Sequence, residues 1–427
     1  MKKTAIIGAG ITGLAAASAL SEKNHEVTVY DKNSMPGGLC RHFEFEGETV
    51  ENYYHYYLPY DKKLIEFTDK RNIRIIWKKI KLGFFYKKNI YDYNSIFEMI
   101  NFKPLSLINR IRNIGGTALL LYLIKAGLFK HNSAVNSLKI LIGKKNYDIL
   151  WKDLLQKKFH CFSDSLTLDW LIYRIIRVSM NQSVFVNSYT YGYFKNQVSE
   201  ITNTLLTDLK KNNCSLIFNK EIKTINTING KLEIDGKSYD SVISTIPLNS
   251  VSKILHSVSP EFSSKLSSVK YLDLITPVFI VKKKITDYFW LNVVDDDFIY
   301  PGIIEFTNIN SEMWKNKNYS LLYFPFYLTK NMEKMSDEYY ITKAIEILRQ
   351  VNQNFEPDDI LQTFCFRDIN TQAISDADFY KLNLSFKTPV KNFYIADSAL
   401  FQPDDRSISE CISLAEKITS VILKEEL

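Results

Sequence analysis

A glycine motif near the start of the chain constrains the fold more than any other feature. A short β-rich run, Thr4–Ile7, leads into Gly-Ala-Gly-Ile-Thr-Gly at 8–13, and a helical stretch follows at 14–23. A second strand-like run at 25–30 ends at Asp31, where a carboxylate can bond the ribose hydroxyls of an adenosine. This order of elements is typical of a dinucleotide-binding unit. We therefore expect an α/β fold with a Rossmann-like domain.

The residues of the motif have separate physical tasks. Gly8 permits the tight turn, Gly10 lets a pyrophosphate approach the backbone, and Gly13 lets the helix pack closely on the strand. The helix that follows directs the free amides and the positive dipole end of its N-terminus at the phosphates, and we expect Ile11 and Thr12 of the motif to contact the cofactor as well. A glycine turn of an unrelated α/β unit would lack this complete context, so we expect a dinucleotide site here.

A second glycine pair distinguishes between two classes of dinucleotide. Lys32 begins a short linker to Gly37 and Gly38, and Leu39 and Arg41 follow. This segment resembles the flavoprotein superfamily of amine oxidases, protoporphyrinogen oxidases, phytoene desaturases and UDP-galactopyranose mutases. The resemblance implies that the cofactor is FAD, with the glycine pair along the pyrophosphate and Arg41 in contact with the cofactor. From its residue type alone, Arg41 could equally be a surface cation.

The C-terminal region resembles the segment that closes the FAD site in the same superfamily. A strand-like run ends at Asp397, and a helix with one apolar face begins after Ser407 and Ile408. The resemblance implies that Asp397 lies near the phosphate and ribitol, and that the helix start lies under the flavin, where its dipole stabilises negative charge. Between them, Pro-Asp-Asp-Arg at 403–406 resembles the Pro-Glu-Asp-Arg of a bacterial protoporphyrinogen-oxidase-like subgroup.

The resemblance also implies two interleaved domains. The FAD-binding domain would comprise 1–60, 186–264 and 356–427, and an α+β substrate domain would comprise 61–185 and 265–355. Apolar spacing predicts mostly helix in 61–185 and strands in about 265–350.

Several elements of the middle FAD segment can be predicted from local patterns. We expect a helix over about 188–210 and strands at 214–218, 221–225 and 241–247. Asn229-Gly230 is a hairpin signal. The resemblance implies that the strand containing Ile222 places its backbone against the adenine.

The candidate catalytic residues are less sharply defined than the cofactor residues. His55 lies among four tyrosines, which include Tyr54 and Tyr57, directly after the first FAD segment. A histidine beside a flavin could relay a proton or hold a substrate oxygen. The same cluster could instead be an aromatic core with one hydrogen-bonded imidazole.

Three arginines are candidates for contact with an anionic substrate. Arg406 could pair with the substrate or with the flavin, or be held by Asp404 or Asp405 as a structural pair. Arg174 and Arg177 lie on a helical stretch and could reach a phosphate or carboxylate, or form surface pairs.

Composition excludes some classes of protein. The five cysteines are scattered, so we expect no disulfide framework and no metal site, as in a cytoplasmic protein. The net charge of +7 is mild, and the basic, aromatic segment 71–88 alternates like a solvated strand, so we expect no nucleic-acid partner. No apolar run reaches the length of a membrane span. The apolar run at 117–129 could form either a buried helix or a peripheral contact with the inner membrane face.

Three functions compete for such a chain. The first is an FAD-dependent oxidoreductase that takes a hydride from a small organic substrate at flavin N5. The second is a redox-neutral flavoenzyme of the UDP-galactopyranose mutase type that acts on a nucleotide sugar. The third is a flavin binder that serves as a scaffold, which the full set of cofactor motifs disfavours. Substrate identity, electron acceptor and oligomeric state cannot be read from the sequence.

Overall fold

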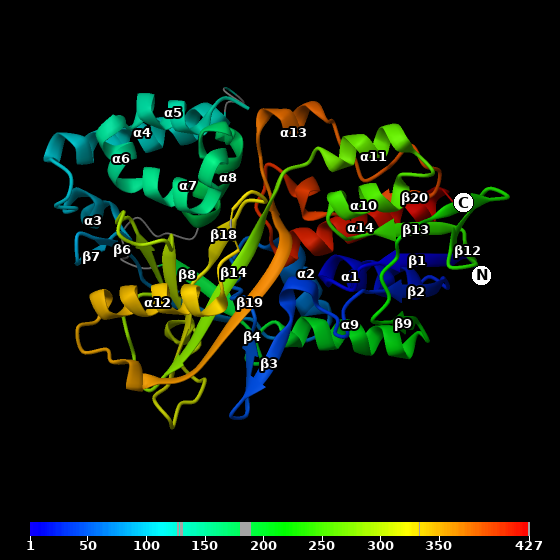
Figure 1. The fold of residues 1–427 in the computed structure, drawn as a ribbon, viewed down its shortest axis with the longest axis horizontal. Helices are drawn as coiled ribbons and strands as arrows, with labels where there is room; N and C mark the ends of the chain where they lie inside the picture. Colours follow the sequence, from blue (N-terminus) through cyan, green and yellow to red (C-terminus); the bar gives the residue numbers. More distant parts are fainter. Residues whose placement is uncertain (126–127, 129–130, 180–188, 333, 426–427) are drawn as a thin grey trace.

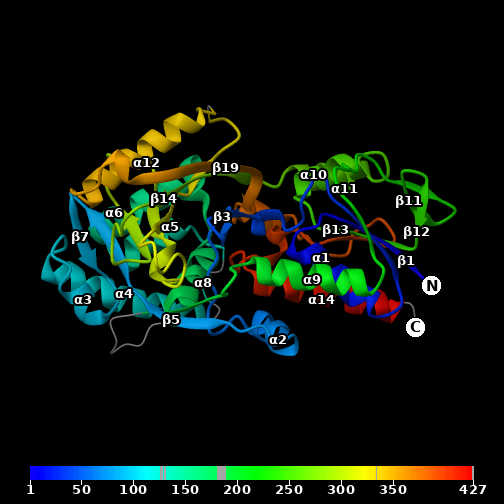
Figure 2. The same cartoon turned by 90° about the horizontal axis from the view of Figure 1, so that it is seen from below.

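The computed structural model describes residues 1–427 except 126–127, 129–130, 180–188, 333 and 426–427. Two lobes lie side by side, and both termini belong to the same lobe (Figures 1 and 2). The lobe with the termini is built on a parallel five-stranded sheet. Its strands are, in spatial order, β20 (Phe393–Ile395), β13 (Ser241–Ser244), β1 (Lys3–Ile7), β2 (Glu26–Tyr30) and β9 (Ser215–Ile217).

Helices cover both faces of this sheet, because its strands bury both sides. Ile6 and Val29 point to one core, and Ala5 and Ile7 point to the other. The first face is covered by α1 (Ile11–Ser21), α2 (Lys62–Lys70), α9 (Ser199–Lys211) and α14 (Ile408–Glu425). The second is covered by α10 (Leu248–Leu255), α11 (Pro260–Ser267) and the small sheet of β10 (Asn226–Ile228), β11 (Lys231–Ile234) and β12 (Lys237–Tyr239).

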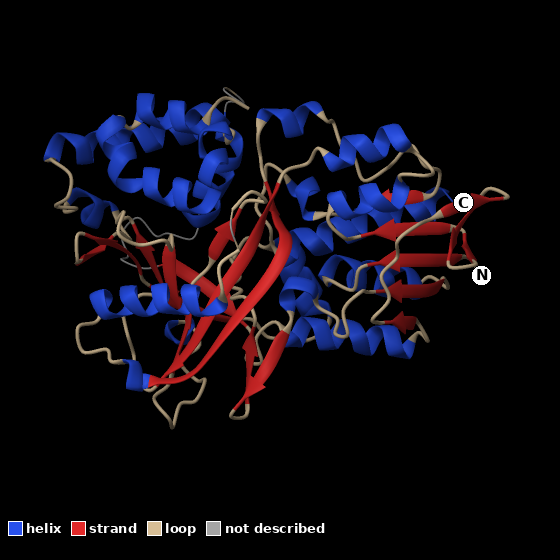
Figure 3. Ribbon diagram, viewed as in Figure 1, coloured by secondary structure: helices blue, strands red, loops and turns tan. Residues whose placement is uncertain are grey.

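The second lobe contains a large mixed sheet, whose long strands run diagonally beside the first lobe in Figure 3. Its strands are β18 (Phe326–Leu328), β14 (Tyr271–Val281), β17 (Ser320–Tyr323), β16 (Gly302–Glu305), β15 (Trp290–Val293), β6 (Leu82–Tyr86) and β7 (Asn89–Asp92), with β19 (Ile360–Ala373) paired along β14. Helix α12 (Asp337–Val351) packs its apolar side on one face of the sheet.

A group of helices completes the second lobe. It consists of α3 (Ile96–Ile100), α4 (Leu107–Lys125), α5 (Ala134–Leu141), α6 (Lys144–Leu150), α7 (Lys152–Phe159) and α8 (Leu168–Ser179). Two antiparallel strand pairs lie at the junction of the lobes, namely the hairpin of β3 (His42–Phe45) with β4 (Glu48–Glu51), and β5 (Ile76–Ile80) with the sequence-distant β8 (Tyr189–Tyr193). A short helix, α13 (Ala377–Lys381), follows β19.

The structure confirms the predicted α/β class and the Rossmann-like unit, and it corrects several local predictions. Residues 189–193 form β8 rather than the start of a helix, and α9 begins at Ser199. Residues 221–225 form no strand, because no neighbouring strand pairs with them. The segment 61–185 begins with helix α2, but β5, β6 and β7 then interrupt the predicted helical region before α3.

Two of the predicted domain boundaries fall at notable places in the structure. Strand β19 pairs with β14 in the second sheet, although the predicted FAD segment starts at residue 356. The predicted boundary at 185 and 186 lies outside the described residues, as do part of the 117–129 run and the start of the predicted 188–210 helix.

Candidate functional site

The glycine turn after β1 has the geometry that the motif predicts. Gly8 has a φ of +107°, which favours glycine, and its amide donates to the Tyr30 carbonyl at 2.8 Å. A Cβ on Gly13 would lie 2.0 Å from the Gly8 carbonyl oxygen, so α1 can pack this closely only on a glycine. A Cβ on Gly10 would meet no atom within 4 Å. Gly8 and Gly13 are therefore needed by the fold, whereas Gly10 borders open space.

The second glycine pair lies directly against the first motif. The Gly37 amide donates to the Ala9 carbonyl at 2.8 Å, and Gly10 and Gly37 form a parallel bridge. Gly37 and Gly38 have φ values of +110° and +60°. A Cβ on Gly38 would lie 3.3 Å from the Gly10 Cα. The two predicted cofactor segments thus form one continuous backbone surface.

Asp31 links this surface to the end of β2. Its carboxylate accepts hydrogen bonds from the amides of Ala9 at 2.7 Å and Asn33 at 2.8 Å. The Asp31 carbonyl also accepts from the Lys220 amide at 2.8 Å, which brings the loop with buried Ile222 beside it. Lys32 is exposed. The predicted adenosine residues are therefore neighbours, although Ile222 lies in a loop rather than a strand.

Arg41 is held in place by two acceptors. Its Nε donates to the Gly38 carbonyl at 3.0 Å, and its Nη2 bonds the Asp368 carboxylate at 2.6 Å. The Tyr53 hydroxyl donates to the same carboxylate oxygen at 2.9 Å. Leu39 is half-buried against the core of the helical group. Arg41 is thus a fixed group beside the glycine pair rather than a free surface cation.

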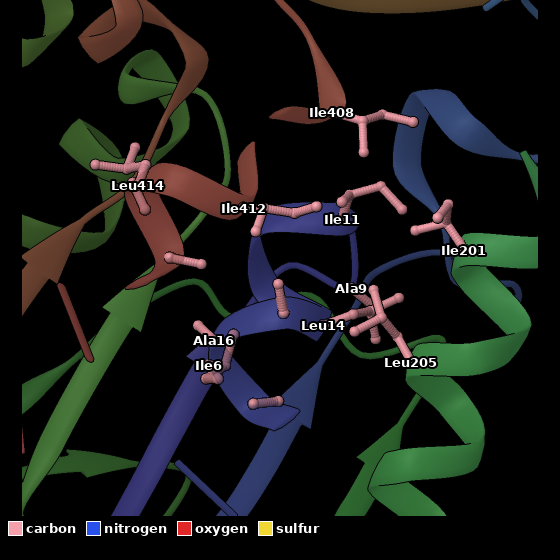
Figure 4. Close-up of a cluster of buried hydrophobic side chains, with 14 of the residues drawn as sticks. Ile6, Ala9, Ile11, Leu14, Ala16, Ile201, Leu205, Ile408, Ile412 and Leu414 are labelled. Atoms are coloured by element: carbon pink, nitrogen blue, oxygen red, sulfur yellow. The ribbon is translucent and has the colours of Figure 1, made fainter. Parts of the chain in front are cut away.

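The closing segment of the chain starts its helix next to α1. Helix α14 begins at Ile408, and the Ser407 hydroxyl caps it by accepting from the Glu410 amide at 3.1 Å. Figure 4 shows Ile408 and Ile412 beside Ile11, all within one buried cluster. The predicted meeting of the first and last cofactor segments is therefore present in the fold.

Asp397 is turned inward. It is buried, and its Oδ1 accepts from the Tyr271 hydroxyl at 2.9 Å and from the Ala399 amide at 2.6 Å. Burial raises the pKa of Asp397 to about 6. In this structure the carboxyl group orders the segment that leads to α14.

His55 has partners on both ring nitrogens. Nδ1 lies 2.7 Å from the buried Glu51 carboxylate, and Nε2 lies 3.6 Å from the Cys40 sulfur. Burial alone lowers the pKa of His55, but the Cys40 sulfur and the Glu51 carboxylate together raise it well above its ordinary value. The Glu51 carboxylate is itself fixed by the Val198 amide at 2.7 Å. Any proton transfer through His55 would therefore involve Cys40 or Glu51.

The two lobes meet at an ion pair between α8 and the segment before α14. Arg174 Nη1 bonds the Asp405 carboxylate. Burial opposes ionisation of Asp405, but Arg174 and Lys158 hold the pKa of its carboxyl well below the ordinary value. The predicted pairing of the Arg406 guanidinium with Asp404 or Asp405 is not formed, because Arg174 occupies Asp405 and Arg406 Nη1 donates to the Thr371 carbonyl.

Positive charge exceeds negative charge at this junction. The Lys158 ammonium lies 5.1 Å from the Tyr327 ring centroid and has no carboxylate partner among the described residues. Burial and the neighbouring charges of Arg174 and Arg406 lower the pKa of Lys158 to about 7. The Nε of Arg406 is buried and unpaired within the same described part of the chain. Asp405 is paired with Arg174, and neither Lys158 nor Arg406 forms an ion pair among the described residues, so the junction is suited to an anionic group.

Aromatic rings line the same junction. Tyr54 packs edge-on against Trp290, with ring centroids 5.5 Å apart, and the Arg174 guanidinium lies 6.0 Å from that Trp290 ring. Tyr56 stacks on Tyr191 at 4.5 Å. Tyr54 therefore belongs to a half-buried wall of rings beside the cations.

The other two predicted substrate residues are engaged in structural contacts. Tyr57 is buried against Phe194, which leaves it little surface for a substrate. Arg177 pairs with the buried Asp61 carboxylate at 3.1 Å, which is the structural alternative. We therefore leave Tyr57 and Arg177 out of the proposed substrate site.

Sequence reasoning missed several residues that the structure brings to the site. Glu51 could have been found from its four-residue spacing to His55, whereas Cys40, Lys158, Trp290 and Asp368 carry no local signal. Their roles depend on contacts between distant segments.

Comparisons with known proteins cover the chain unevenly. Residues 6–70 match a family model described as an NAD(P)-binding Rossmann-like domain. A protein of Methanocaldococcus jannaschii is 27% identical over 281 residues, which are 62% of this chain and 61% of that protein. A 4,4'-diapophytoene desaturase (4,4'-diaponeurosporene-forming) of Staphylococcus haemolyticus is 47% identical over 47 residues, 11% of this chain and 9% of the desaturase. The matched regions thus span less than two thirds of these curated relatives.

Solved structures match the whole chain. A putative protoporphyrinogen oxidase from Exiguobacterium sp. 255-15 has a TM-score of 0.76 at 13% identity, covering 99% of both chains. A reduced UDP-galactopyranose mutase has a TM-score of 0.76 at 16% identity, covering 99% of this chain and 96% of the other. Cyclohexylamine oxidase from Brevibacterium oxydans IH-35A has a TM-score of 0.72 at 12% identity, covering 99% of both chains. The chain therefore shares its overall fold with these three solved structures.

Proposed function

We propose that the chain is an FAD-dependent oxidoreductase that acts on a small organic substrate. The observation that carries the proposal is the convergence of the Gly8–Gly13 turn, the Gly37–Gly38 pair and the start of α14 on one side of the sheet. The open space at Gly10 fits the close approach of a pyrophosphate. The names of the similar oxidases and of the desaturase relative support the same reaction class.

The residues that would hold FAD follow from this arrangement. The glycine backbone and the amides of Ile11 and Thr12 would bind the pyrophosphate at the start of α1. Asp31 and the backbone at Ile222 would face the adenosine. The remaining contacts would come from Arg41 beside the glycine pair and from the ordered segment between Asp397 and the α14 start at Ser407 and Ile408.

Bound FAD would supply a hydride acceptor at N5, and the protein would supply binding and orientation. The α14 N-terminus, with Ser407 as its cap, would stabilise negative charge on the nearby cofactor. Glu51 would orient His55 through the 2.7 Å contact at Nδ1, and His55 would hold a proton near Cys40.

We propose that the substrate binds at the junction of the two lobes. Its walls would be the rings of Tyr54 and Trp290, which exclude water from the reacting bond. Lys158 and Arg406 lack carboxylate partners among the described residues, so we propose that they bind an anionic group of the substrate. Arg174 would be fixed by Asp405 as one edge of this site.

Anaerobic spectroscopy of the purified protein tests this function. An oxidoreductase predicts that a substrate bleaches the visible flavin absorbance and that an electron acceptor restores it. A redox-neutral mutase predicts turnover of a nucleotide sugar only after prior reduction, with no net electron change, and this result would overturn the proposal. Absence of bound flavin would also overturn it.

A further inference from the structure

Helix α4 exposes an apolar stripe on the surface of the helical group. Gly115 and the large side chains of Ile108, Ile111, Leu119 and Tyr122 recur every three or four residues, which places them on one helix face. The exposed fraction is 76% for Ile108, 61% for Ile111, 47% for Leu119 and 70% for Tyr122. The opposite side of α4 is buried, as the core residue Leu120 shows. The stripe is thus a second apolar face that the described fold does not cover.

The stripe continues onto the neighbouring helix α5. Ile140 of α5 is 72% exposed, and its carbonyl accepts a hydrogen bond from Arg112 of α4 at 3.0 Å. Figure 1 shows α4 and α5 at the edge of the helical group, away from the lobe that carries the termini. We call Ile108, Ile111, Leu119, Tyr122 and Ile140 the apolar face.

Helices α4 and α5 carry only basic charged residues, among them Arg110, Arg112 and Lys139. Acidic residues begin on the adjoining helices, with Glu98 of α3 and with Asp148 of α6, which pairs with Lys144. Arg110 donates to the Ile100 carbonyl at 2.8 Å, and Arg112 donates to the Ile140 carbonyl. Neither guanidinium has a carboxylate partner among the described residues. Their charge is therefore available to an anionic partner.

We propose that the apolar face docks on an anionic lipid surface. Isolated exposed side chains are common, but a helical stripe of large apolar groups flanked by cations is typical of a helix that lies in a membrane interface. Each cation near an anionic surface adds attraction, and an acidic partner protein would have to match both the flat apolar stripe and the surrounding cations. Within the described residues, no helix is long and apolar enough to cross a membrane. Docking would therefore be peripheral.

Vesicle flotation of the full chain tests this proposal. Wild-type protein should float with vesicles that contain phosphatidylglycerol and much less with pure phosphatidylcholine vesicles. The double variant Ile108→Asp/Ile111→Asp should reduce the bound fraction by about tenfold or more, because withdrawing one isoleucine side chain from an apolar phase already corresponds to about a tenfold change. Both positions are exposed, so circular dichroism and the Tm should stay unchanged.

A matched control separates this face from general surface hydrophobicity. Ile228 is 46% exposed on β10 in the other lobe, and Ile228→Asp should float like the wild type. Equal binding to both vesicle types, or equal binding by the double variant, would overturn the proposal. A self-associated wild type that ignores vesicles and is dispersed by the double substitution would also overturn it, because the face would then bind a second copy.

Discussion

Two alanine substitutions in the glycine turn should differ in their effect on stability. In Gly13→Ala, the new Cβ would lie 2.0 Å from the Gly8 carbonyl oxygen and 3.0 Å from the Thr245 hydroxyl. The backbone atom cannot move without separating α1 from β1, so we expect the upper end of overpacking costs, about 3 kcal/mol. In Gly10→Ala, the Cβ meets nothing within 4 Å, and the φ of −74° suits alanine. Its stability should stay within about 0.5 kcal/mol of the wild type.

The same pair separates folding from cofactor binding. The Gly10 Cβ would occupy the space through which the pyrophosphate approaches, so Gly10→Ala should weaken FAD binding by at least about tenfold, or about 1.4 kcal/mol. Unfolding should be measured in urea on cofactor-free protein, because a bound ligand adds its own stabilisation. FAD affinity should be measured by titration of the refolded or stripped protein.

Two outcomes would refute this reasoning. If Gly10→Ala binds FAD as tightly as the wild type, the cofactor does not pass over Gly10. If Gly13→Ala unfolds at the wild-type urea concentration, α1 does not pack on β1 as closely as the geometry requires.

Three further predictions concern the ionisable groups of the site. Asp405→Asn should leave Arg174 without its carboxylate and lower the free energy of unfolding by about 1–3 kcal/mol, measured in urea. Burial raises the pKa of Asp397 to about 6, so the folded state binds its proton more tightly than the unfolded state, and this group should lower stability as the pH rises from about 4 to 6. Asp397→Asn should remove that decline from a series of unfolding curves, and an unchanged decline would refute it. Lys158→Met should leave stability at pH 7 unchanged or raise it, because a buried ammonium is lost, while raising the KM of an anionic substrate about tenfold. A variant with an unchanged KM would exclude Lys158 from the substrate site.

Local patterns were sufficient to predict the Rossmann-like unit at the start of the chain. The glycine turn needs only neighbouring residues, so spacing alone located the turn at Gly8 and the close helix packing at Gly13. The Asn229-Gly230 hairpin was likewise predictable, since both residues adopt the positive φ values that such a turn requires. The start of α14 was also located from the apolar spacing along one face of the helix.

Local patterns gave wrong predictions where the formation of a strand depends on a partner strand from a distant part of the sequence. Residues 221–225 alternate like a strand, but no neighbouring strand pairs with them, and they remain a loop beside Asp31. The prediction included Tyr189–Tyr193 in the helix that follows it. In the structure this aromatic segment is strand β8, which pairs with β5.

The chemistry at the lobe junction was the least predictable part. Arg174 and Asp405 are 231 residues apart, and Arg41 and Asp368 are 327 residues apart, so sequence spacing carries no information on either pair. Lys158 has no motif of its own and is notable only because the fold buries it near other cations.

Identification of the cofactor retained by the purified protein tests the central claim most directly. The protein should be expressed without added nucleotide, purified and denatured, and the released cofactor should be analysed by chromatography and its absorbance spectrum. The account predicts FAD in near-stoichiometric amount from the wild type and a marked loss from Gly10→Ala. Release of a nicotinamide dinucleotide instead of FAD, or no nucleotide binding even after incubation with FAD, would contradict it.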